Sequence, residues 1–375
     1  MQTTKNYYAG LQANLAYLTM PPQIIDQLSS LTNNLGDCYE THKCPVPNSM
    51  VQERLAVEHV AQWLSLSKEE CWGYVGGGST LGNLQGMWMG SALIPNATCV
   101  FTDTAHYSIP KFASTLRFKQ LKVIKTHKNG ELDLNDLAQQ IEPHEKVVIV
   151  LTAGTTMTSA YDPIDACIQI LKQKNCQFYL HLDAALGGLI IPFLSTAQFP
   201  NKHEYTFENV DISSMTISAH KVLGMPMPAN IFISRQHVVK KFKSIVNKVP
   251  LLGNLEDITV YGSRDGFRAS VLYERLNQCS FNTISEWVQQ GLRLAQYTTQ
   301  KLQQMGFLHT FAVTGGLATV ILRQEFEQRV SNSKAIIEKY HLVQDHTYIH
   351  IYMMGHIDQN ICDAILSDIY EQSHV

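Results

Sequence analysis

The sequence lacks several features that mark common classes of protein. No stretch of eighteen apolar residues occurs, and the first residues do not form a basic segment followed by an apolar one, so we expect neither a membrane-spanning helix nor a secretory signal. The formal net charge is only −3 and no basic stripe is present, which argues against nucleic acid and membrane surfaces as partners. We therefore expect a cytoplasmic protein that binds a small molecule.

The eight cysteines do not form a recognisable framework. They are scattered without a CxxC pair, which argues against a zinc site and against a set of disulfides, so we expect reduced, mostly buried thiols and no bound metal. Neither a GxGxxG motif nor a Walker lysine accompanies the glycine-rich stretch near residue 77. A dinucleotide-dependent oxidoreductase or a nucleotide-binding protein is therefore a remote alternative.

What the sequence does contain is enough apolar material for one large core. Of its 375 residues, 45% are hydrophobic and 16% are charged, so the chain should be globular throughout. We expect an N-terminal arm (1–45), a large α/β domain (46–270) and a small C-terminal α+β domain (271–375). Strands, loops and helices alternate in the middle of the chain, which predicts a mostly parallel central sheet.

Particular segments carry these expectations. Apolar residues at helical spacing predict helices over 50–66, 164–172 and 284–305. Short apolar runs predict strands, and polar segments rich in glycine or asparagine predict turns at 33–37 and 261–266. The predicted strands cover 99–102, 147–151, 178–182, 215–217, 231–234, 317–322 and 348–352.

The segment Met215–Pro228 contains the first candidate for chemistry. Its apolar run predicts a buried strand, and the glycine and prolines that follow Lys221 predict a stiff turn. A lysine at the mouth of a buried strand can lose its hydration, become partly neutral and act as an amine nucleophile. The alternative is an ordinary solvated lysine at a strand end.

A second apolar run ends in Asp183, and a crossover between the two runs would bring Asp183 and Lys221 to one edge of a parallel sheet. A plain ion pair is the simpler interpretation. The other is that Asp183 faces the pyridine nitrogen of pyridoxal phosphate while Lys221 holds its aldehyde. Ala184 and Ala185, which follow Asp183, would leave room for a flat ring.

Upstream segments offer a seat for a phosphate. Three glycines precede Ser79 and Thr80, and backbone N–H groups at a helix start, together with two hydroxyls, favour an anion, although an isolated turn of this kind is often structural. Hydroxyl donors also follow the run 147–151, at Thr152, Thr155 and Thr156.

Two further side chains have both a functional and an ordinary interpretation. His106 follows the run 99–102, and its imidazole could stack on a cofactor ring, meet the substrate carboxylate or transfer a proton; the alternative is a satisfied polar group. Arg264 is a candidate for a second phosphate contact or a subunit contact, and equally an ordinary surface cation.

An ordered set of motifs resembles the group II pyridoxal-phosphate-dependent amino acid decarboxylases, from about Asn33 to the end of the chain. Within that family the sequence is most similar to bacterial histidine decarboxylases and next to plant serine decarboxylases. The motifs are Thr80-Leu-Gly-Asn83, His106-Tyr-Ser108, Gly154-Thr-Thr156, His181-Leu-Asp-Ala-Ala-Leu-Gly187, Ser218-Ala-His-Lys221 and Gly262-Ser-Arg-Asp-Gly266.

The resemblance implies a type I aminotransferase-like fold, a pyridoxal 5′-phosphate cofactor and a homodimer with active sites shared between subunits. It implies that Lys221 forms the Schiff base, that Asp183 pairs with the pyridinium nitrogen, and that His106 stacks on the ring and meets the substrate. The remaining expected cofactor contacts are Ser79, Thr80, Thr155, Ala185, Ser218 and His220.

The activity implied is decarboxylation of an L-amino acid, above all of L-histidine to histamine and CO2. Decarboxylation of serine or an aromatic amino acid, oxidative deamination and transamination are the alternatives, because the same lysine and aspartate serve them all. The sequence departs from the usual family pattern at Leu81, Ala219 and Ala229-Asn230. These departures bear on the substrate more than on the cofactor.

Overall fold

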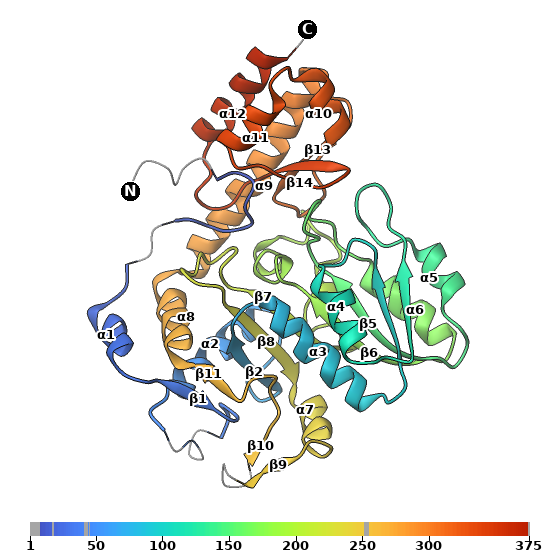
Figure 1. The fold of residues 1–375 in the computed structure, drawn as a ribbon, viewed down its shortest axis with the longest axis vertical. Coiled ribbons are helices and arrows are strands. Elements are labelled where there is room, and N and C mark those ends of the chain that lie inside the picture. Colours follow the sequence, from blue (N-terminus) through green and yellow to red (C-terminus); the bar gives the residue numbers. More distant parts are fainter. Residues whose placement is uncertain (1–7, 17–18, 41–43, 45, 251–254, 374–375) are drawn as a thin grey trace.

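The computed structural model describes residues 8–16, 19–40, 44, 46–250 and 255–373. Its largest element is a seven-stranded sheet in the order β2-β8-β7-β6-β5-β3-β4 (Figure 1). In that order the strands are β2 Cys71–Gly76, β8 Asn230–Arg235, β7 Ile212–Ser218, β6 Gln177–Asp183, β5 Lys146–Thr152, β3 Thr98–Thr102 and β4 Gln120–Ile124.

The sheet is mostly parallel, as the sequence predicts. Strands β4, β3, β5, β6 and β7 pair in parallel, whereas β8 runs antiparallel to both β7 and β2. Strand β2 therefore points the same way as the parallel strands. The carboxyl ends of β2, β3, β5, β6 and β7 all lie at one edge of the sheet, which is the edge where open α/β sheets bind ligands.

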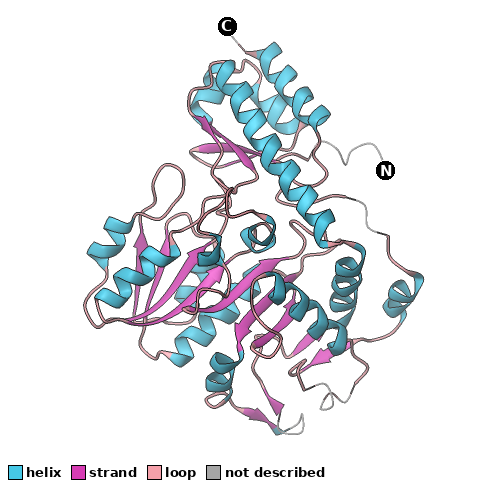
Figure 2. Ribbon diagram, turned by 180° about the vertical axis from the view of Figure 1, so that it is seen from behind, coloured by secondary structure: helices cyan, strands magenta, loops and turns pink. Residues whose placement is uncertain are grey.

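Helices cover both faces of this sheet (Figure 2). Side chains alternate along β2: Cys71 and Val75 pack in the core shared with α2 and α6, whereas Trp72 and Tyr74 pack in the core on the other side. This two-sided burial explains the nearly continuous apolar runs that predicted the strands. The helices are α2 Met50–Trp63, α3 Ser79–Leu93, α4 Ser108–Thr115, α5 Leu134–Gln140, α6 Ile164–Gln173, α7 Gln236–Lys243 and α8 Gly266–Gln278.

The C-terminal elements form a smaller α+β unit at one end of the molecule (Figure 1). It has its own antiparallel sheet, in the order β12-β13-β15-β14, and its own apolar core. Its strands are β12 Thr310–Phe311, β13 Ala318–Leu322, β15 Tyr348–Tyr352 and β14 Val343–Gln344, and its helices are α9 Phe281–Gln304, α10 Arg323–Arg329, α11 Ser333–Lys339 and α12 Gln359–Gln372.

The predicted domain limit at residue 270 falls inside α8, which packs against α2 of the large unit. The division of the chain at 45 and 270 remains a prediction. The two predicted turns at 33–37 and 261–266 are wrong in part, because β1 Asn33–Leu35 pairs with β11 Ser263–Asp265 in an antiparallel ladder. Both segments are polar and short, so the sequence shows no apolar alternation that would predict two paired strands.

The N-terminal arm contains one short helix, α1 Pro22–Ile25, which continues as a 3-10 turn, η2 Asp26–Ser29. A two-stranded hairpin, β9 Lys248–Val249 with β10 Leu255–Glu256, projects from the large unit. No helix among the described ranges is long and apolar enough to cross a membrane.

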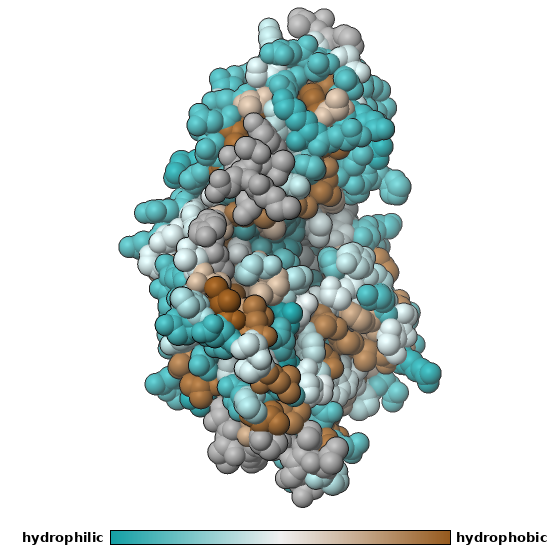
Figure 3. Space-filling model, turned by 60° about the vertical axis from the view of Figure 1, so that its left-hand side comes forward, coloured by the Kyte–Doolittle hydropathy of each residue, from teal (hydrophilic) through white to brown (hydrophobic). Residues whose placement is uncertain are grey.

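One side of the molecule carries several exposed apolar side chains. Figure 3 looks toward the side that holds α1, α8 and the β1–β11 pair, and brown atoms gather in groups over its lower half. Among residues 22–55, the exposed large hydrophobic residues are Ile25, Leu28, Leu31, Val51 and Leu55, each between 38% and 72% exposed. Exposed apolar side chains can mark a surface that binds another protein when they lie together.

Candidate functional site

A cavity of about 250 Å³ lies at the carboxyl edge of the large sheet. It receives side chains from the ends of β2, β3, β5, β6 and β7, so segments far apart in the sequence converge there because their strands are parallel. Its lining residues are Gly77, Gly78, Ser79, Thr80, Asn83, His106, Tyr107, Thr152, Gly154, Thr156, Asp183, Ala185, Ser218, His220, Lys221 and Pro228. Of the expected catalytic and cofactor-binding residues, Thr155 is absent from this lining, and so is Arg264, the candidate for a second phosphate contact.

The glycine turn after β2 is held in place before α3 begins. The Gly77 N–H donates to the Tyr261 hydroxyl at 2.6 Å, and the Gly78 N–H donates to Asn230 Oδ1 at 3.1 Å. Gly78 has a φ of +120°, a backbone conformation that residues other than glycine rarely adopt. The turn therefore leaves the first N–H groups of α3, at Ser79 and Thr80, facing the cavity as an anion seat.

Hydroxyls from two strand ends meet at this seat. Ser79 Oγ and Ser218 Oγ lie 2.7 Å apart, and both residues are buried. The His220 ring lies at the same end of β7 and hydrogen-bonds through Nδ1 to the backbone of Ala229. Hydroxyls, a helix N-terminus and an imidazole together suit a phosphate group.

Asp183 lies at the end of β6 and is only 3% exposed. Its Oδ2 accepts a hydrogen bond from Asn83 Nδ2 at 2.7 Å, and its Oδ1 accepts from the Ala185 N–H at 3.1 Å. Two donors fix the carboxylate without a cation bonded to it. A buried carboxylate in this state is ready to pair with a positively charged partner in the cavity.

The layer behind Asp183 determines which atoms donate. Asn83 Oδ1 must accept, because its amide nitrogen donates to Asp183, so His181 Nε2 carries the proton in the contact of 3.0 Å between them. His181 Nδ1 then accepts from Ser214 Oγ at 2.8 Å. Burial lowers the pKa of His181 to about 4, although Asp183 raises it, so this imidazole is neutral.

Lys221 occupies the turn after β7, as the sequence predicts. Burial lowers the pKa of Lys221 to about 8, even though the nearby Asp183 raises it. A fraction of the amine is therefore neutral at neutral pH, and only a neutral amine can act as a nucleophile. Lys221 is partly buried at the cavity, which favours the nucleophilic interpretation over that of an ordinary solvated lysine.

His106 lies on the loop after β3, with its ring next to the exposed Tyr107 ring at a centroid distance of 4.1 Å. The Ser108 N–H donates to His106 Nδ1 at 3.3 Å, and Ser108 Oγ lies 2.7 Å from the same atom, so Nδ1 is an acceptor and Nε2 carries the proton. Burial lowers the pKa of His106, while Asp183 raises it. The loop thus presents a neutral donor to the cavity.

Thr155 has internal partners. Its hydroxyl lies 2.8 Å from the Thr158 hydroxyl and accepts from the Ala160 N–H at 3.0 Å, so it is occupied in shaping the loop after β5. Thr152, in contrast, lines the cavity and has a buried Oγ1 without a protein partner. A buried hydroxyl in this state is available to a ligand.

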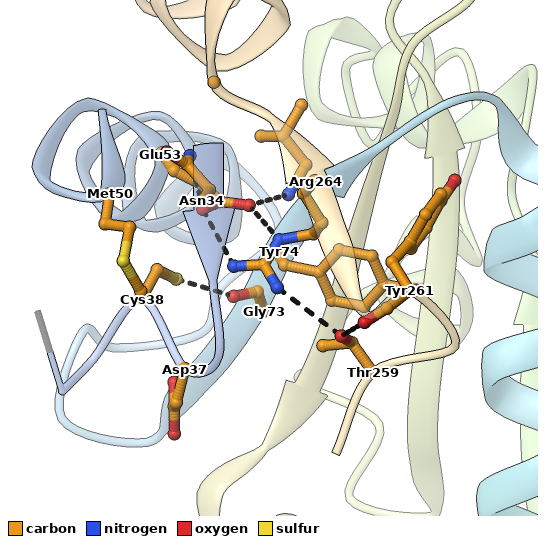
Figure 4. Close-up of polar contacts among 12 residues, drawn as sticks. Asn34, Asp37, Cys38, Met50, Glu53, Gly73, Tyr74, Thr259, Tyr261 and Arg264 are labelled. Carbon is orange, nitrogen blue, oxygen red and sulfur yellow. Dashed lines mark hydrogen bonds and ion pairs between the residues drawn. The ribbon is translucent and has the colours of Figure 1, made fainter. Parts of the chain in front are cut away.

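Arg264 is a buried structural residue (Figure 4). Its guanidinium donates from Nε to Glu53 Oε1 at 2.8 Å and from Nη2 to Oε2 at 3.1 Å, and both side chains are almost fully buried. Asn34 Nδ2 and the Val75 N–H also donate to Glu53. Arg264 does not line the cavity, and its ion pair instead ties β11 and β1 to α2 and β2.

Breaking this pair should destabilise the fold. We expect Arg264→Leu to lower the free energy of unfolding by about 3–5 kcal/mol, because it leaves the Glu53 carboxylate buried without a cation. Arg54→Leu is the matched control, because Arg54 lies next to Glu53 on α2 and pairs with Glu58 near the surface. Its substitution should lower the free energy of unfolding by at most about 1 kcal/mol. Urea denaturation of both variants checks this, and equal midpoints would contradict it.

The residues around the cavity fit a phosphorylated pyridine aldehyde. The lining offers hydroxyls and a helix N-terminus that suit a phosphate, the Asp183 carboxylate that suits a ring nitrogen, and the partly neutral amine of Lys221 that suits an aldehyde. The unpaired Thr152 hydroxyl adds a donor. Fold and cavity together define a pyridoxal-phosphate-dependent enzyme of the aminotransferase-like type.

Comparison with known proteins narrows this class. Residues 83–323 match the family model described as the pyridoxal-dependent decarboxylase conserved domain. Histidine decarboxylase of Solanum lycopersicum is 30% identical to this chain, and the alignment covers 98% of this chain and 85% of that protein. Histidine decarboxylase of Morganella morganii is 32% identical, and the alignment covers 73% of this chain and 71% of that protein. The chain belongs to the pyridoxal-dependent decarboxylase family, and it is a carboxy-lyase that acts on an amino acid.

Solved structures agree on the fold. L-methionine decarboxylase from Streptomyces sp. 590 superposes with a TM-score of 0.81 over 98% of this chain and 92% of its own, at 21% identity. Glutamate decarboxylase from Lactobacillus brevis gives a TM-score of 0.77 over 99% and 90%, at 16% identity. At these identities the likeness establishes the architecture, which is the one that the sequence predicts.

Proposed function

We propose that this enzyme converts L-histidine to histamine and CO2. The observation that carries the reaction type is the convergence of Lys221, Asp183 and a phosphate seat on one cavity, in a chain that belongs to a decarboxylase family. The choice of histidine as the substrate rests on the relatives of this chain. Two decarboxylases that match 98% and 73% of the chain, at 30% and 32% identity, are named for histidine.

In this proposal, residues of the cavity lining would hold the cofactor. Ser79, Thr80, Ser218 and His220 would bind the phosphate, Asp183 would pair with the ring nitrogen, and Lys221 would supply the amine for the aldehyde. Bound pyridoxal phosphate supplies an electron sink for the electron pair that departing CO2 leaves behind. Ala185 keeps the ring's place free of a bulky side chain.

The protein's own groups then perform the remaining tasks. Asp183 keeps a proton on the ring nitrogen, because its carboxylate is buried and already fixed by Asn83 and Ala185. His106, whose Nε2 carries the proton, orients the substrate at the cavity wall. Lys221, with its pKa of about 8, exchanges a proton near neutral pH.

A panel of amino acids tests the substrate. We expect trapped CO2 and the matching amine to appear with L-histidine at a kcat/KM at least about 100-fold above that for L-serine, L-tyrosine or L-methionine, because a site that hydrogen-bonds an imidazole rejects side chains that leave its polar groups unpaired. Release of ammonia or a keto acid in place of CO2 would favour the deaminating alternatives. A preference for serine or an aromatic amino acid would overturn histidine as the proposed substrate, but the protein would still be an amino acid decarboxylase.

We also propose a cytoplasmic homodimer. The exposed apolar side chains of Ile25, Leu28, Leu31, Val51 and Leu55 support the packing of a second copy on the N-terminal side of the molecule, and Tyr107, which is 71% exposed beside the cavity, is a further apolar surface that a second copy could cover. All eight cysteines are free thiols, which fits a reducing compartment. Sedimentation of the purified protein should give twice the monomer mass of 42.2 kDa, and a monomer at micromolar concentration would argue against the dimer.

A further inference from the structure

Residues 8–16 form an N-terminal strap that lies beside the C-terminal unit (Figure 1) and also contacts the turn that carries Lys221. On one side it is bound by β15 and by the residue that follows α11: the Ala9 N–H donates to Tyr340 O at 3.0 Å, and the Tyr352 N–H donates to Ala9 O at 2.6 Å. His350 Nε2 lies 3.0 Å from Gly10 O. Backbone contacts of this kind fix the path of a segment that has no secondary structure of its own.

The other side of the strap is bound to the turn that carries Lys221. The Asn14 N–H donates to Lys221 O at 2.8 Å, and Asn14 Nδ2 donates to Val222 O at 3.0 Å. Gly224 has a φ of +65°, and a Cβ there would lie 2.6 Å from Asn14 O. The strap and the turn therefore pack too closely for a side chain at Gly224.

Between these two attachments, Gln12 reaches the reactive amine. Lys221 Nζ donates to Gln12 Oε1 at 2.5 Å. On the same side chain, Nε2 donates to Thr156 O at 2.9 Å and to the Tyr352 hydroxyl at 2.6 Å. A carbonyl oxygen can only accept, so Thr156 requires the amide nitrogen on its side and the amide oxygen must face Lys221.

Tyr352 makes this orientation rigid. Its ring is fully buried, and its hydroxyl donates to Thr156 O at 3.1 Å and lies 2.9 Å from Ser159 Oγ. The Gln12 amide therefore lies against groups that the large unit and the C-terminal unit fix together. The sequence offers no sign of this, because Gln12 lies in an irregular segment far along the chain from every motif.

We propose that Gln12 is a further residue of the active site, which holds the Lys221 amine at the cavity wall whenever that amine is not bonded to the cofactor. The inference rests on the proposed role of Lys221. The strap carries the residue to its place, so the site is complete only when residues 8–16 are docked. A hydrogen-bond acceptor stabilises an ammonium more than an amine, so Gln12 also favours the protonated form of Lys221.

The other charged or titratable groups that act on this amine come from four elements. Asp183 at the end of β6 favours its protonated form, while His106, His220 and His350 interact with it from the β3 loop, the β7 turn and β15. All three histidines have pKa values lowered by burial, so they are neutral where Lys221 titrates. Burial lowers the pKa of Lys221, and Asp183 and Gln12 are then the groups that favour its protonated form.

The test follows pyridoxal phosphate capture by the cofactor-free full-length chain as a function of pH. In capture the neutral amine adds to the aldehyde carbon and the aldehyde oxygen leaves as water, so the rate should rise with pH through the titration of Lys221, near pH 8. Gln12→Ala removes an acceptor, so we expect a midpoint lower by about half a pH unit and a several-fold slower plateau. Gln12→Glu adds a negative charge, so we expect a midpoint higher by about one unit.

Leu11→Ala is the matched control, because Leu11 is 39% exposed on the same strap and should leave the midpoint unchanged. Opposite shifts for the two Gln12 variants support the proposal, since a merely structural role would move both in one direction or neither. Equal midpoints in wild type and both Gln12 variants overturn it. Absence of capture by the wild type, or the same capture by Lys221→Ala, would instead remove the proposed role of Lys221.

Discussion

Lys221→Ala should abolish decarboxylation, with a loss of at least about 10⁴-fold in kcat. The substitution removes the one amine at the cavity that burial brings to a pKa of about 8, and no other lysine lines that cavity among the described residues. The protein should also lose covalent retention of the cofactor. We expect borohydride-treated wild type, but not the variant, to carry the added mass of the cofactor on the peptide that contains residue 221.

Two controls make this result specific. Lys240→Ala removes an exposed lysine from α7 and should change neither the activity nor the added mass. The Lys221→Ala variant itself should unfold at a temperature close to that of the wild type, because it removes a buried charge-bearing group and not a core contact. Covalent cofactor on any other lysine, with activity retained, would show that the site has been assigned to the wrong residue.

Asp183→Asn should lower kcat by about 10²–10³-fold while KM changes little. The two side chains have the same shape, so the loss reports the missing negative charge opposite the cofactor ring. Asparagine also offers only one acceptor atom where Asn83 Nδ2 and the Ala185 N–H both donate, so one of these donors is left facing an amide NH2 group. Steady-state kinetics with the amine product as readout separates kcat from KM.

The matched control is Asp211→Asn, which removes a carboxylate at the far end of β7, where it pairs with the exposed Lys172. Its kcat should equal that of the wild type. Asp183→Glu keeps the charge but displaces it, so it should recover part of the lost activity. A kcat within about threefold of wild type for Asp183→Asn would contradict the pairing of Asp183 with the ring nitrogen.

Much of the cavity could be predicted because its residues follow strands whose own sequences are informative. Asp183 and Lys221 each follow an apolar run, and parallel strands end at one edge, so their convergence follows from periodicity and crossover length. The glycine turn before Ser79 is equally local. Thr155 shows the limit of such reasoning. Three threonines lie at or just after the end of β5, and only the folded loop determines which of their hydroxyls face the cavity.

Arg264 shows a different limit. Its polar turn-like surroundings predict an exposed cation, but its partner Glu53 lies on a helix far away in the sequence, and the pairing of β1 with β11 buries both. Neither residue breaks the local pattern of its own segment. A buried ion pair becomes visible only when both elements are in place.

By itself, the sequence determined the mostly parallel sheet, the family and the meeting of Lys221, Asp183 and the glycine turn at one edge of the sheet, because apolar periodicity, strand ends and glycine turns are local properties of the chain. Only the tertiary structure determined that Gln12 meets Lys221, that Arg264 meets Glu53 and that β8 runs against its neighbours. These features depend on single contacts between polar side chains or on the direction of one strand. No periodicity or local composition in the sequence reveals such contacts, because they form between segments that meet only when the chain folds.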